Sequence, residues 1–231
     1  MIGTELTTFI TGLNGGATID PTLLAVLINT AKTIIEEERP WMVLRKTNTS
    51  LSLSTSDTWQ TAKSISGITD FANFYGEFPI RLFDGTNQIQ YYKQIPFDRR
   101  LEYKDVSNTF CYDENAGNLY FNGVAPFSGT AYLNYSAFTS DITGTESTAI
   151  WSPFQSRFVP LLGYYAIGIH KGAIDYDDVV KQMLPENRAV MMSLKNALET
   201  WDAKRQQTSI EGNDPESLHD YPRSGAINIY G

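Results

Sequence analysis

Few residues in this chain have the type and spacing that catalysis needs. Asp98 with Glu102, and Asp141 with Glu146, could each form the carboxylate pair of a glycoside hydrolase. A chain with 26 Asp and Glu residues offers such pairs by chance, and sequence does not fix their separation. Neither pair therefore predicts an enzyme.

A tight group of carboxylates, Asp175, Asp177 and Asp178, could bind a hard cation. The glycine and the distal glutamate of a calcium-binding loop are missing at the required spacing. Asp175 stands where it can cap a following helix, because its side chain can accept a hydrogen bond from a backbone N–H of the first turn. We expect capping and no metal site.

Nucleophilic catalysis has few candidates. His170 lies in an apolar helical segment, and His219 lies near the C-terminus. Cys111 is the only cysteine, which excludes an intrachain disulfide and a Cys-rich zinc site, and it reads as a small buried residue. No Gly-x-Ser-x-Gly elbow, phosphate-binding loop or dinucleotide fingerprint occurs. We expect no enzyme and no cofactor.

The charge balance argues against a protein that grips nucleic acid. Eighteen Lys and Arg against 26 Asp and Glu give a net charge of -8, with no dense basic run. No stretch approaches the roughly 18 apolar residues of a membrane span, and the first residues lack the features of a signal peptide. We expect a soluble protein made in a cytoplasm, without a membrane partner.

Helical patterns occupy both ends of the chain. Residues 4–13 form a short amphipathic helix, and residues 21–39 a longer one that Asp20 caps. Ser152-Pro153 opens a second helical block that runs to residue 169. A last helix from Pro185 turns five residues to the core: Val190, Leu194, Ala197, Leu198 and Trp201.

Three glycines weaken the second helical block: Gly163, Gly168 and Gly172. They indicate either a kink or the close approach of a neighbouring backbone. We favour close packing.

The middle of the chain has the period of two that is typical of strands. Turns near Asp84-Gly85 and Asn115-Ala116-Gly117-Asn118 predict two hairpins, and residues 131–138 a last strand. The many tyrosines of this part could form a sugar-stacking platform, but half of any set on alternating strands should point inward.

Together these patterns predict an α+β fold. We expect a helical bundle from residues 1–48 and 149–207, an inserted antiparallel β-rich lobe at residues 49–148, and an extended C-terminal arm at residues 208–231. The arm is polar but ends in apolar residues, which either strap it across its own subunit or anchor it to a neighbouring one. The candidate partner-binding residues are Tyr221, Ile227, Ile229 and Tyr230.

Short signatures over roughly residues 20 to 206 resemble the head-to-tail adaptor (connector) proteins of tailed bacteriophages. They are Arg39-Pro40-Trp41, Phe110-Cys111-Tyr112-Asp113, Gly117-Asn118-Leu119-Tyr120-Phe121, Ala131-Tyr132-Leu133-Asn134-Tyr135, Trp151-Ser152-Pro153-Phe154 with Arg157-Phe158, the helix at residues 161–169, and Asp177-Asp178. The similarity is one of layout and apolar signatures, without an invariant catalytic motif.

The resemblance implies a structural protein of the virion neck. Its partners would be further copies of itself in a dodecameric ring, the portal protein, and a downstream tail or nozzle protein. DNA would pass through the lumen without specific binding, past acidic side chains. The alternative from another class is a glycan-binding or glycan-hydrolysing module that uses the aromatic β lobe.

Overall fold

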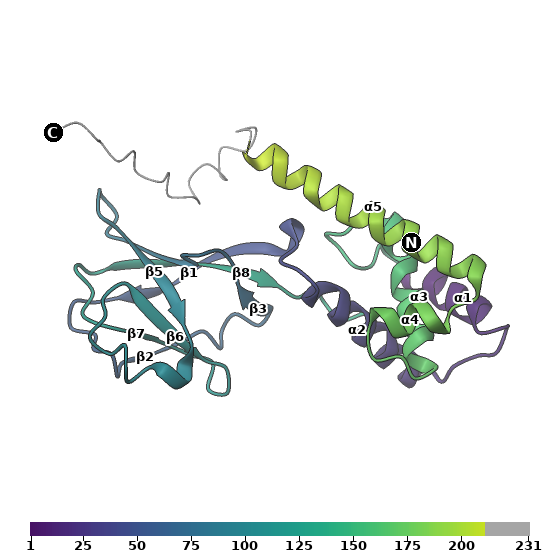
Figure 1. Cartoon of the computed structure of the whole chain (residues 1–231), viewed down its shortest axis with the longest axis horizontal. Helices are drawn as coiled ribbons and strands as arrows, with labels where there is room; N and C mark the ends of the chain where they lie inside the picture. Colours follow the sequence, from purple (N-terminus) through teal and green to yellow (C-terminus); the bar gives the residue numbers. More distant parts are fainter. Residues whose placement is uncertain (211–231) are drawn as a thin grey trace. The chain divides into compact units, whose positions relative to one another are not determined.

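The computed structural model describes residues 1–210. The chain divides into two compact units: Met1–Ile35 together with the chain from Asp141, and Glu36–Ser140 (Figure 1). We call them the helical unit and the β unit.

The β unit is an eight-stranded sheet in the order β1-β8-β4-β5-β6-β7-β2, with β3 also paired to β8. This sheet is barrel-like and nearly closed. Its strands pair antiparallel except for β5 and β6, which are parallel. The strands are β1 Arg45–Leu53, β2 Ala62–Ser64, β3 Phe71–Phe74, β4 Ile80–Phe83, β5 Ile89–Ile95, β6 Thr109–Asp113, β7 Asn118–Phe121 and β8 Gly129–Ala137.

Strand β8 is the centre of this sheet. It pairs with β1, β3 and β4, so Leu133 lies opposite both Asn48 and Ile80. The two expected hairpins are confirmed as β4–β5 and β6–β7, and the expected last strand as β8. Alternate residues of these strands, together with Ile65 just after β2, fill one interior: Leu53, Ile65, Ile80, Leu82, Tyr92, Phe110, Leu119, Phe121, Ala131 and Leu133. Burying each large apolar side chain contributes about 1.5–3 kcal/mol, which holds the sheet closed.

The helical unit has five helices among the described residues: α1 Gly3–Leu13, α2 Pro21–Glu37, whose last turn crosses into the β unit, α3 Pro160–His170, α4 Tyr176–Gln182 and α5 Pro185–Ile210. The short 3-10 helices are η1 Met42–Leu44 and η2 Phe97–Arg99 in the β unit and η3 Ser156–Phe158 in the helical unit. The Asp20 carboxylate accepts hydrogen bonds from the N–H groups of Thr22 and Leu23 and caps α2, as expected.

Helix α3 is apolar on all sides and is buried from Leu161 to Gly168. A methyl group on Gly163 would come within 2.7 Å of the Phe9 ring, and one on Gly168 within 2.7 Å of Val179. Close packing at these two glycines is therefore confirmed, but the neighbours that approach are side chains and not the expected backbone. Gly172 is different, because its φ of +95° needs glycine while no atom crowds it.

The expected fold class is wrong. The chain is a mixed α/β fold dominated by the barrel-like sheet, and not a helical bundle that carries an inserted lobe. Helical periodicity is strong within one segment, whereas short strands signal weakly and pair with strands far along the chain. That difference made the helices look dominant in the sequence.

Two helix predictions also need correction. Helix α3 begins at Pro160, and η3 and turns occupy the residues after Ser152-Pro153. On α5, Val190 is 50% exposed and Ala197 is exposed, while Met191, Leu198 and Asp202 are buried. The buried stripe of α5 therefore begins at Met191, one residue after Val190, where it was predicted to begin. No helix within residues 1–210 is long and apolar enough to cross a bilayer.

Candidate functional site

The candidate nucleophiles and bases within residues 1–210 are Cys111 and His170, and they lie in different units. His170 is exposed at the end of α3, and His219 lies outside the described residues. Cys111 is buried in β6, and its thiol donates to the Tyr120 carbonyl oxygen at 3.7 Å. Burial raises the pKa of this thiol, which keeps it protonated and unreactive.

The carboxylates have structural partners instead. The Asp141 carboxylate pairs with buried Lys32 at 3.1 Å, and Glu102 pairs with Arg99 at 2.8 Å. Burial raises the pKa of the Glu146 carboxyl, but hydrogen bonds from Thr143 and Gly144 outweigh burial and lower it. These contacts hold turns and elements together.

Capping by Asp175 is confirmed, because its carboxylate accepts a hydrogen bond from the Asp178 N–H at 2.8 Å. Asp178 in turn pairs with Lys181 at 2.8 Å. Among the described residues no group of three or more His, Cys, Asp or Glu side chains could hold a metal ion.

Arginines cover three of the tyrosines that were considered as a sugar platform: Tyr103, Tyr120 and Tyr132. The guanidinium carbon of Arg100 lies 3.6 Å from the Tyr120 ring centroid, and that of Arg81 lies 4.6 Å from the Tyr132 centroid. Tyr92 is buried in the interior of the sheet. Rings that are stacked under guanidinium groups or buried leave little face for a sugar.

The helical unit exposes an uncharged stretch of α2, which ends before Glu37. Its exposed residues before Glu37 are Pro21, Thr22, Leu23, Val26 and Thr30, which we call the α2 stripe. Leu23 is 43% exposed and Val26 57%. Residues 21–31 contain no charged residue, so this uncharged stretch is visible in the sequence itself.

Other apolar side chains of the helical unit are also exposed. They lie on α5 or in the loops that flank α4: Ile174, Leu184, Val190 and Met192. Single exposed apolar residues are ordinary, but a helix face without charges is not typical of free protein surface.

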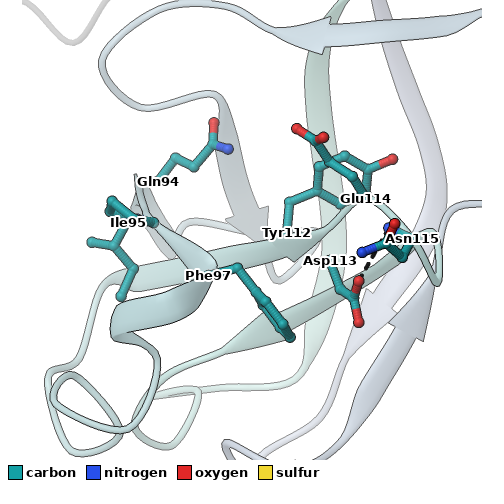
Figure 2. Close-up of a pocket in the computed structure, with 8 residues that line it drawn as sticks. Gln94, Ile95, Phe97, Tyr112, Asp113, Glu114 and Asn115 are labelled. Carbon is teal, nitrogen blue, oxygen red and sulfur yellow. Dashed lines mark hydrogen bonds between the residues drawn. The ribbon is translucent and has the colours of Figure 1, made fainter.

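The β unit has a pocket of about 510 Å³ at the ends of β5 and β6. Figure 2 shows its lining: Ile95 and Phe97 come from the end of β5 and from η2, and Tyr112 to Asn115 come from the end of β6 and the turn after it. Gln94 and Pro96 complete the lining.

The four predicted partner-binding residues, Tyr221, Ile227, Ile229 and Tyr230, lie outside the described residues, as does most of the expected arm. Helix α5 itself continues to Ile210. The sequence matches no model of a known protein family and no curated protein.

Proposed function

We propose that this chain is a structural protein of the virion neck, a head-to-tail adaptor that forms a ring beneath the portal and joins the capsid to the tail. The observation that carries the proposal is the α2 stripe, with Leu23 and Val26 exposed on a stretch of the helix, residues 21–31, that has no charged residue. Such a face is stabilised when a second surface covers it.

The proposed occupant of the α2 stripe is a second copy of this chain. When one surface of each copy binds a different surface of the next copy, the copies form a closed ring if a whole number of these rotations makes one full turn. Fully burying a Leu or Val side chain contributes about 1.5–3 kcal/mol, and a ring repeats that gain at every interface. The dodecameric ring is part of this proposal.

The other proposed partners are the portal protein, a downstream tail or nozzle protein, and DNA that passes without specific binding. The net charge of -8 supports the last of these, because an acidic lumen repels the phosphate backbone. The proposed role of Tyr221, Ile227, Ile229 and Tyr230 is to anchor the C-terminal segment to a neighbour. A glycan-binding role gains no support from tyrosines that lie under arginines.

The test places a charge in the α2 stripe. Val26→Glu should abolish or strongly reduce ring formation, measured by native mass spectrometry, because burying an unpaired carboxylate is costly. Thr8→Glu is the matched control: it adds the same charge at an exposed position of α1 and should leave assembly unchanged.

Circular dichroism of both variants should match the wild type, since both positions are exposed. Rings of Val26→Glu as abundant as those of the wild type would overturn the role of the α2 stripe. A second variant that ends at Ile210 should keep its fold and dock poorly to portal protein; wild-type docking would refute the role of the C-terminal segment.

A further inference from the structure

Helix α5 has an exposed face that carries no charge. Its exposed residues from Ala189 to Ala203 are all uncharged: Ala189, Val190, Met192, Ser193, Asn196, Ala197, Thr200 and Ala203. We call these residues the α5 face. Val190 is 50% exposed and Met192 is 43% exposed. The solvent side of a surface helix normally carries Lys, Arg, Glu and Asp, so the α5 face is not typical of a surface that stays in water.

The charged residues of the same span are turned away from this face. Asp202 is fully buried and accepts a hydrogen bond from the Gln206 side chain at 3.0 Å. Lys195 is half-buried, and its ammonium group lies 3.5 Å from the centroid of the Tyr176 ring. Glu199 is half-buried as well. The helix therefore has charges on its buried side and its flank, which is the reverse of an ordinary surface helix.

The helical unit thus exposes two uncharged helix surfaces, the α2 stripe and the α5 face. The inner side of α5 packs against α3 and η3, where the Trp201 ring contacts Phe158 at a centroid distance of 5.5 Å. Figure 1 shows α2 and α5 apart from one another, so the two surfaces do not cover each other within one chain. A ring of identical copies needs two different surfaces on each copy, because one of them binds the other on the next copy.

The shapes of the two surfaces are complementary. The α2 stripe projects two branched apolar side chains, Leu23 and Val26. The middle of the α5 face has the smaller side chains of Ser193, Ala197 and Thr200. Side chains of one helix pack into the spaces between those of another when the axes come within about 8–10 Å, and small residues leave such spaces. Contact between two α2 stripes would instead leave the α5 face uncovered.

The spacing of the two surfaces matches when the helices run antiparallel. The last three residues of the α2 stripe are separated by three and then four residues, and three residues of the α5 face have the same separations in the reverse direction. At a rise of about 1.5 Å per residue, each set spans about 10 Å. The alignment gives three opposed pairs: Leu23 with Thr200, Val26 with Ala197, and Thr30 with Ser193.

The same alignment brings opposite charges together at one end. Asp20 directly precedes the α2 stripe and is exposed, and Lys204 directly follows the α5 face and is exposed. Antiparallel docking places these two residues within one helical turn of each other. Parallel docking would instead direct Asp20 toward the end of α5 that carries exposed Glu186. An exposed ion pair adds little affinity, but it favours one orientation over the other.

We propose that the α5 face of each copy binds the α2 stripe of the next copy, with the two helices antiparallel. The occupant of the α5 face is therefore a second copy of this chain. The inference rests on the proposed function, because it names the second surface of the ring interface. The two surfaces are different, so a bound pair still presents one of each and further copies can add until the ring closes.

Disulfide cross-linking in the full chain tests this pairing. Cys111 is buried, so introduced cysteines on the surface are the reactive ones. The double variant Val26→Cys/Ala197→Cys should give a ladder of cross-linked oligomers on a non-reducing gel, which a reductant returns to single chains. Each single variant should remain a single chain on the same gel, and an equimolar mixture of the two should give dimers. Val26→Cys/Thr8→Cys is the matched control: it places the second cysteine at an exposed position of α1 and should give no ladder.

The outcomes separate this inference from the proposed function. Wild-type rings in native mass spectrometry without a ladder from the double variant would overturn the pairing and leave the ring standing. A single-chain mass of the wild type would overturn both. Dimers of Val26→Cys alone would mean that α2 meets α2, and cross-links of Ala197→Cys to added portal protein without a ladder would assign the α5 face to the portal. Either result would overturn the pairing.

A charge reversal tests the orientation. Lys204→Glu should weaken ring assembly by about two- to fivefold, the range of an exposed ion pair, because it places a second carboxylate beside Asp20. Asp20→Asn keeps a side chain that caps α2 and removes the charge, so Lys204→Glu should have little effect in that background. Equal weakening in both backgrounds would overturn the antiparallel alignment.

Discussion

Helix α3 and strand β8 are the central elements of the two units, and they achieve burial by opposite means. On α3, Gly163 and Gly168 remove side chains so that Phe9 and Val179 can approach the backbone. On β8, large side chains such as Leu133 reach into an interior that strands from distant parts of the chain complete. The stability of the helical unit should therefore fall when atoms are added at these glycines. The stability of the β unit should fall when atoms are removed from its buried side chains.

The two units also differ in what they leave exposed. The helical unit exposes Leu23 and Val26 on a charge-free stretch of a regular helix, whereas the most exposed large apolar side chains of the β unit, Leu101 and Val124, lie in loops. An exposed apolar stretch on a regular helix suits a protein neighbour. We therefore place the proposed assembly surface on the helical unit.

The largest effect should come from removing atoms in the β unit. Leu133→Ala deletes a fully buried side chain and should lower the free energy of unfolding by about 2–5 kcal/mol. Hydrogen exchange should become faster throughout residues 36–140 and change little in residues 1–35. Val124→Ala, at an exposed loop position, is the control. Uniform loosening of both units would break the comparison.

A smaller effect should come from adding one methyl group to the helical unit. Gly168→Ala presses a Cβ against the branched Cβ of Val179, and overpacking of this kind costs about 1–3 kcal/mol. Alanine recovers up to about 1 kcal/mol of helix propensity, so we expect a net loss of about 1–2 kcal/mol in denaturant unfolding. Gly12→Ala, where no atom lies within 4 Å, should be stabilising. Equal changes at both glycines would contradict close packing.

The smallest effect concerns a buried hydroxyl in the β unit. The Tyr92 hydroxyl has no hydrogen-bond partner among the described residues, and burial raises its pKa to about 12. Tyr92→Phe should therefore stabilise the fold by about 1 kcal/mol at neutral pH.

The same hydroxyl sets the pH dependence. Because the folded pKa of Tyr92 lies above the ordinary value of 10, the contribution of its neutral form is complete below pH 10 and is lost as the pH rises toward 12. The advantage of Tyr92→Phe should grow over that range, measured by urea unfolding at pH 7 and pH 11. If the difference in unfolding free energy between Tyr92→Phe and the wild type is the same at pH 7 and pH 11, the pKa of Tyr92 is not raised in the folded state.

Local signals in the sequence predicted much of the fold. The caps at Asp20 and Asp175, the two hairpins and the packing role of Gly168 each depend on a few neighbouring residues. The barrel-like sheet was missed because it depends on pairings such as Leu133 with Ile80 and the parallel β5–β6 pair, which no local pattern specifies.

The candidate sites divide in the same way. The α2 stripe could have been found from the charge-free residues 21–31. The pocket could not, because Phe97 and Asp113 meet only through the register of two strands that are separated by a long connection. The spacing of these residues in the sequence does not indicate that they line the same pocket.

The most direct test of the assembly claim is the native mass of the wild-type chain, measured alone and after mixing with portal protein. We predict a closed ring of identical subunits, with twelvefold symmetry in negative-stain images of the mixture. A single-chain mass under both conditions, at protein concentrations up to those of the stained sample, would contradict the account.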